Sequence, residues 1–159
     1  MHKITVSLGN IDDAIRQIEE YEKKVQEKIK EFLTRLLEDG ANIAKAKIME
    51  LDAIESSELQ DSLQYTLYKE GNKGIIFTDC SHACFVEFGT GVRGSASPHP
   101  TMPWAYDSNG HGEDGWYYYD TKQGRVRFTQ GMPSRPFMYE TARELEQKAV
   151  EIAREVFSQ

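Results

Sequence analysis

The sequence has few cysteines and little positive charge, and it lacks a long apolar run. Its two cysteines, Cys80 and Cys84, have no second Cys or His pair at zinc spacing. We therefore expect two buried, reduced thiols, with no structural metal and no cofactor. Acidic residues outnumber basic ones by 26 to 19, and phosphate contacts require a basic surface. We expect no sequence-specific contact with nucleic acid.

The apolar runs are also too short for a membrane protein. None approaches the roughly 20 residues that span a bilayer. The sequence therefore predicts a soluble protein that is made in a cytoplasm and has no membrane partner.

Two stripes of apolar residues predict long helices near the two ends of the chain. Asn10 is the predicted N-cap of the first helix, and Asp39-Gly40 predicts a break or kink in it. Its stripe advances in steps of three or four residues, with one final step of seven, and comprises Ile11, Ile15, Ile18, Tyr21, Val25, Ile29, Phe32, Leu36 and Ile43. In the second helix, Ser134 is the predicted N-cap and Pro136 the opening residue. Phe137 follows, and we expect it to be a core anchor buried against the sheet.

Alternating and aromatic segments between these helices predict two β-hairpins. Their strands and turns are Ser62–Tyr68, Glu70–Gly74, Ile75–Thr78, Trp116–Tyr119, Lys122–Gly124 and Arg125–Thr129. The order of elements predicts one α+β domain over residues 1–159. In it, an antiparallel sheet built from both hairpins packs against the two helices, and a long irregular loop is inserted.

The segment from His82 to Gly91 leads into this loop. Ser81 is a candidate cap for a short helical turn that ends at Gly89. Residues 92–115 are rich in Gly, Pro, Ser, His and aromatics without periodicity, and loops of that length are usually functional or disordered. We predict a flexible arm over 92–115, with Trp104 and Tyr106 on its contact surface. The predicted hinge comprises Glu87, Phe88, Gly89, Thr90 and Gly91.

Catalytic and metal-binding patterns are weak throughout the sequence. Asp107–Asp114 resembles a calcium loop but places His111 and Tyr118 where an EF-hand needs oxygen ligands. No spacing assembles an active site. The alternative function is a small thiol- and His-dependent hydrolase in which Cys84 works with His82 or His99.

Three fragments, in their order, resemble one protein family. They are Ser57–Leu63, His82–Gly91 with its core Val86–Gly91, and Gly131–Met138 with its Arg-Pro-Phe-Met ending and Ala142 shortly after. Together they are similar to the head-tail joining or tail-completion proteins of siphophages and prophages, which are minor tail components. The resemblance extends from Ala41 to Glu146.

The resemblance implies a non-enzymatic structural protein of a bacteriophage or prophage. Such a protein is made in the bacterial cytoplasm, enters the virion at the head-tail junction, and completes the tail end that faces the capsid. It also implies assembly as a ring-shaped homo-oligomer that contacts neighbouring neck and tail proteins.

Overall fold

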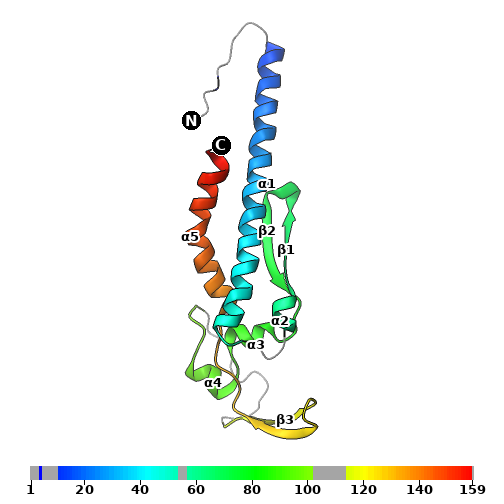
Figure 1. Cartoon of the computed structure of the whole chain (residues 1–159), viewed down its shortest axis with the longest axis vertical. Coiled ribbons are helices and arrows are strands. Elements are labelled where there is room, and N and C mark those ends of the chain that lie inside the picture. Colours follow the sequence, from blue (N-terminus) through cyan, green and yellow to red (C-terminus); the bar gives the residue numbers. More distant parts are fainter. Residues whose placement is uncertain (1–3, 5–10, 54–56, 102–113, 159) are drawn as a thin grey trace. The chain divides into compact units, whose positions relative to one another are not determined.

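The structure is a computed structural model that describes residue 4 and residues 11–53, 57–101 and 114–158. It confirms the α+β class (Figure 1). The elements in chain order are α1 (Ile11–Glu50), α2 (Glu58–Asp61), β1 (Leu63–Tyr68), the 3-10 turn η1 (Lys69–Gly71), β2 (Lys73–Thr78), α3 (Ala83–Phe88), α4 (Gly91–Ala96), β3 (Trp116–Asp120), β4 (Arg125–Thr129) and α5 (Phe137–Phe157).

The chain divides into two compact units. Unit 1 comprises Met1–Asn42, Gln64–Phe77 and Glu144–Gln159, and unit 2 comprises Ile43–Leu63 and Thr78–Arg143. Helices α1 and α5 contribute residues to both units. Whether the chain behaves as a single domain stays a prediction.

Helix α1 continues through Gly40, where the sequence predicts a break. It has 40 residues, which at 1.5 Å per residue gives a length of about 60 Å. A Cβ atom at position 40 would collide with Ile76 Cδ1 and lie 2.9 Å from Leu145 Cδ2. Glycine at this position therefore lets side chains from β2 and α5 approach the helix axis, and the local cost of glycine in a helix is offset by this packing.

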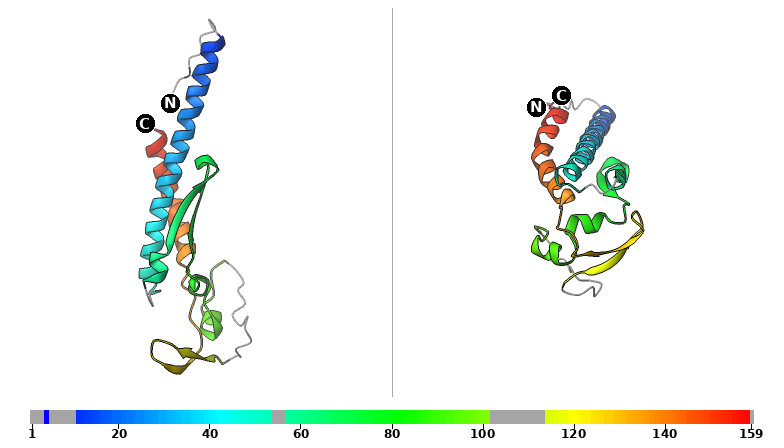
Figure 2. Two further views of the ribbon diagram at one scale, coloured as in Figure 1. Left: turned by 90° about the vertical axis from the view of Figure 1, so that its right-hand side faces the viewer. Right: turned by 60° about the horizontal axis from the view of Figure 1, so that its bottom comes forward.

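Unit 1 is organised around α1. The Phe32 and Phe157 rings lie 6.2 Å apart between centroids, and Lys28 Nζ donates to the Val156 carbonyl at 3.0 Å. Figure 2 shows that the C-terminal part of α5 and the β1–β2 hairpin both lie alongside α1. Leu37, Ala41, Ile152 and Val156 are buried in this unit.

The two hairpins form two separate two-stranded sheets, whereas the sequence predicts one sheet built from both. Strands β3 and β4 pair antiparallel, from Trp116 opposite Thr129 to Asp120 opposite Arg125. The β3–β4 hairpin belongs to unit 2, and nearly all of the β1–β2 hairpin belongs to unit 1. Periodicity predicts each strand and its nearest partner, but the pairing of one hairpin with another depends on tertiary contacts.

Candidate functional site

Glu87 connects three segments of unit 2. Helix α3 ends at Gly89, whose φ of 79° favours glycine. Two residues earlier, the Glu87 carboxylate accepts the backbone N–H groups of Met138 at 2.8 Å and Tyr139 at 3.0 Å. These N–H groups belong to the first turn of α5, where the helix dipole favours a negative charge. Glu87 therefore caps a helix that begins far along the chain.

His99 completes this buried arrangement. Its Nε2 lies 3.2 Å from Glu87 Oε1, and its exposed fraction is 7%. The imidazole ring lies 4.7 Å from the Phe88 ring and 5.5 Å from the Tyr139 ring, measured between centroids. Sequence spacing does not predict this pair, because the residues between them, which include α4 (Gly91–Ala96), show no periodic pattern. Their contact fixes the start of that segment against α3 and α5.

Backbone contacts join the Glu87–Gly91 segment to residues 130–135. Ser134 Oγ donates to the Glu87 carbonyl at 2.6 Å, so this hydroxyl, the predicted cap of α5, bonds to α3 instead. Thr90 and Met132 form an antiparallel bridge. A Cβ atom at Gly89 would lie 2.6 Å from the Ser134 backbone nitrogen. The predicted hinge is thus a closely packed segment, and its hinge and interface roles stay predictions.

The predicted arm over 92–115 differs from the structure in its first part. Gly91–Ala96 form α4, in which the Gly94 N–H donates to the Thr90 carbonyl at 3.0 Å. The Arg93 N–H donates to the Gln130 carbonyl at 3.1 Å. These contacts, with the burial of His99, make residues 92–101 part of unit 2. Trp104 and Tyr106 lie outside the described residues.

Phe137 is the first residue of α5 and is 1% exposed. Helix α5 therefore begins with a side chain that is buried in unit 2. The energetic role of this side chain as a core anchor stays a prediction.

The hydrolase alternative requires Cys84 beside His82 or His99. Cys84 is exposed on α3, whereas the thiol that lies against His82 is that of Cys80, with Sγ 3.2 Å from Nδ1 and 3.3 Å from Nε2. His99 lies against Glu87. Each histidine thus has a partner other than the one that the hydrolase hypothesis needs. Cys80 is buried, as predicted for both thiols, and the exposure of Cys84 is a correction.

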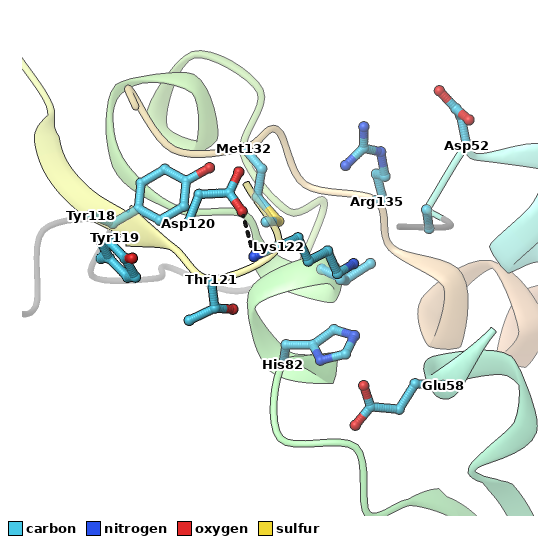
Figure 3. A pocket seen from close by; sticks show the side chains of 12 residues that line it. Asp52, Glu58, His82, Tyr118, Tyr119, Asp120, Thr121, Lys122, Met132 and Arg135 are labelled. Carbon is cyan, nitrogen blue, oxygen red and sulfur yellow. Dashed lines mark hydrogen bonds between the residues drawn. The ribbon is translucent and has the colours of Figure 1, made fainter. Parts of the chain in front are cut away.

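A pocket of about 590 Å³ opens in unit 2 beside His82 (Figure 3). The turn of the β3–β4 hairpin forms one wall, where Asp120 Oδ1 accepts the N–H groups of Lys122 and Gln123, each at 3.0 Å. The Gln123 N–H and the Arg127 guanidinium hold the pKa of Asp120 below its ordinary value. The lining residues are Asp52, Ala53, Glu58, His82, Val86, Tyr118, Tyr119, Asp120, Thr121, Lys122, Met132 and Arg135.

Unit 1 carries two apolar surfaces that are open to solvent. The first, called here the α1 stripe, comprises Ile11, Ile15, Ile18 and Tyr21, which are 77%, 50%, 56% and 47% exposed. The second is a shallow depression on α5, called here the α5 hollow, lined by Ala149, Val150, Ala153, Arg154, Phe157 and Ser158. Val150 is 55% exposed and Phe157 is 42% exposed. Contiguous apolar surface of this kind marks interaction sites.

Helices long and apolar enough to cross a membrane are absent from the part of the chain that the structure describes.

Comparison with known proteins gives a family match, over part of the chain. Residues 12–89 match the model of the family described as "Bacteriophage HK97-gp10, putative tail-component". The match confirms the resemblance to phage tail proteins and indicates a structural role in a virion. It contains the first sequence motif and most of the second, and the Gly131–Met138 motif lies beyond it. Searches of curated proteins and of solved structures find no significant match.

Proposed function

We propose that this protein is a tail component, specifically a non-enzymatic head-tail joining or tail-completion protein that assembles as a homo-oligomeric ring. It is made in the bacterial cytoplasm and enters the virion at the neck. The family match supports the tail location. The observation that carries the ring is the presence of two different apolar surfaces, the α1 stripe and the α5 hollow, on the same unit.

The α1 stripe continues a packing seam that is already used inside unit 1. Its spacing of four and three residues extends along α1 through Val25 and Ile29 to Phe32, which packs against Phe157. The seam is thus covered by α5 at one end and exposed at the other. A second helix of the same type is the occupant that fits the exposed end.

The α5 hollow supplies such a helix in a second copy of this chain. When the stripe of one copy binds the hollow of the next, each copy uses two different surfaces, and this heterologous contact closes into a ring if the rotation permits. In this arrangement, the α1 stripe of each copy binds the α5 hollow of a neighbouring copy.

Two single variants test this arrangement. Ile15→Glu disrupts the stripe and Val150→Glu disrupts the hollow, so each variant alone should stay monomeric at concentrations where the wild type forms higher oligomers. An equal mixture retains one intact contact per pair and should form dimers, which native mass spectrometry and sedimentation velocity resolve. Met49→Glu is the matched control, because Met49 is 58% exposed on α1 but lies outside the stripe.

Other occupants of the stripe give different results. If a segment of the same chain covers it, wild-type protein stays monomeric even when concentrated and Ile15→Glu lowers the melting temperature only. If the contact joins two identical surfaces, one of the two variants keeps that contact and still dimerises alone, and the mixture forms no species that is absent from the separate variants. Either result contradicts the proposed ring contact.

The predicted arm provides a separate proposed surface for neighbouring neck and tail proteins, through Trp104 and Tyr106. Deletion of residues 102–113 with a short Gly/Ser bridge leaves α4 and the Glu87–His99 contact in place. We expect this variant to fold and to form rings, but to fail in completing infectious particles. Particles that remain infectious would contradict the role of the arm.

A further inference from the structure

Three side chains in unit 2 converge with ligand atoms of different chemistry. Glu58 lies in α2, Cys80 follows β2, and His82 is the N-cap of α3. One ligand atom from each residue lies within 4.8 Å of the other two. The Cys80 thiol is buried, whereas Glu58 is exposed at the edge of the unit 2 pocket. Figure 3 shows Glu58 and His82 side by side at that edge.

This donor set matches the preference of zinc. Thiolate sulfur, imidazole nitrogen and carboxylate oxygen are its usual protein ligands, with bond lengths of about 2.0 to 2.3 Å. In a tetrahedral site, such bonds place neighbouring ligand atoms about 3.4 to 3.6 Å apart. The Cys80 sulfur is 3.2 and 3.3 Å from the two ring nitrogens of His82, so the spacing suits a shared metal ion once the imidazole turns to direct one nitrogen lone pair at it.

The third ligand requires little rearrangement. Glu58 has an exposed, flexible side chain that can move its carboxylate toward the sulfur and the imidazole at low cost. Three protein ligands leave the fourth position of a tetrahedron vacant, and the adjoining pocket admits water to it. We propose that Glu58, Cys80 and His82 bind one zinc ion, with water as the fourth ligand.

The consequence of this site is a link between distant segments. Zinc would connect α2 to the residues that precede α3, and so join the start of the Ser57–Leu63 motif to the start of the His82–Gly91 motif. Because the ligands converge only in the folded chain, zinc should bind the native state and stabilise it. This proposal is independent of ring formation.

Cobalt substitution gives a direct test. Reduced full-length protein titrated with Co²⁺ should develop the intense visible bands of tetrahedral cobalt and a near-ultraviolet band from thiolate-to-cobalt charge transfer. Added Zn²⁺ should displace the cobalt and raise the melting temperature. Absence of these bands together with an unchanged melting temperature would overturn the proposal.

Variants distinguish this site from adventitious binding. Cys80→Ser should abolish the charge-transfer band, while the matched control Cys84→Ser, which removes the exposed thiol, should retain it. Because Cys80→Ser removes a buried group and can impair folding, Glu58→Gln provides a second test on an exposed residue. Glu58→Gln should weaken zinc binding more than about tenfold. Loss of a residue that only hydrogen-bonds to a metal ligand already weakens binding by about that factor, and Glu58 is proposed as a ligand itself. Equal loss in Cys84→Ser, or unchanged affinity in Glu58→Gln, would contradict the site.

Discussion

The two units differ in how they use polar and apolar side chains. Among the described residues, the buried polar side chains are Glu87, His99 and Thr141, and all three lie in unit 2. Large apolar side chains are exposed in both units, along α1 and α5 in unit 1 and mainly on the β3–β4 hairpin in unit 2. The motif around Glu87 therefore contributes buried polar contacts to its own unit, whereas the two surfaces that we propose for ring assembly lie on the amphipathic helices of unit 1.

The largest effect should come from the interior of unit 2. Phe137→Ala removes a side chain that is 1% exposed, and such truncations cost about 3 to 5 kcal/mol because a cavity remains. Phe128→Ala, on the exposed face of β4, should cost less than about 1 kcal/mol. Denaturant unfolding measures both variants. Equal losses would show that Phe137 is no more a core residue than Phe128.

The next effect tests whether Glu87 maintains the fold. Glu87→Gln keeps the shape but removes the charge that accepts two α5 N–H groups and contacts His99. We expect a loss of about 2 to 3 kcal/mol in the free energy of unfolding. Glu140→Gln removes a charge from the same first turn and should cost under about 1 kcal/mol. If the assembly of Glu87→Gln fails while its stability is normal, the residue belongs to an interface instead.

Two glycines with positive φ differ in how closely they are packed. Gly89 and Gly124 have φ values of 79° and 64°, so alanine at either site is strained by at least about 1 to 2 kcal/mol. The strain is larger at Gly89, whose ψ of 172° lies in a region that is essentially restricted to glycine. A Cβ atom added at Gly89 would lie 2.6 Å from the Ser134 backbone nitrogen, whereas one added at Gly124 would lie 3.9 Å from Tyr119 Oη, an ordinary contact distance. Gly89→Ala should therefore cost about 1 to 3 kcal/mol more than Gly124→Ala in denaturant unfolding. Equal costs would indicate that the 87–91 segment yields easily, as a hinge does.

The smallest effect concerns acid stability at the β3–β4 turn. The folded pKa of Asp120 is lowered from 3.8 by the Gln123 N–H and by Arg127. Its contribution to stability is therefore present above that ordinary value and is lost as pH falls through the folded pKa. Asp120→Asn should reduce the acid-induced fall in melting temperature below about pH 4, whereas the exposed control Asp61→Asn should not. Identical acid profiles for all three proteins would contradict this assignment.

Local pattern predicted much of the fold. The apolar stripe predicted α1, alternation and turn residues predicted the hairpins, and Gly89 correctly predicted the end of α3. The predicted break at Gly40 was wrong, because this glycine packs against Ile76 and Leu145, and helix propensity does not take such tertiary contacts into account. Helix α4 was missed for a similar reason, since its glycine-rich sequence has low helix propensity and is held by Thr90 and Gln130.

The candidate sites were less accessible to sequence reasoning. Glu87 was selected as part of a motif, but its partners Met138 and Tyr139 are 51 and 52 residues away. Glu58 is likewise remote from Cys80 and His82, so no zinc spacing was visible. The α1 stripe was visible as a pattern, but only the structure shows which part of it α5 leaves uncovered.

The capping of α5 by Glu87 also has a consequence for the order of folding. A helix with its own N-cap can begin as soon as its residues are synthesised, whereas the first turn of α5 obtains its acceptor from a residue 51 positions upstream. Closing so long a loop costs entropy before the contact returns any stability. The start of α5 should therefore form late, after α3 is in place, and the C-terminal helix becomes a reporter of whether unit 2 has completed its fold.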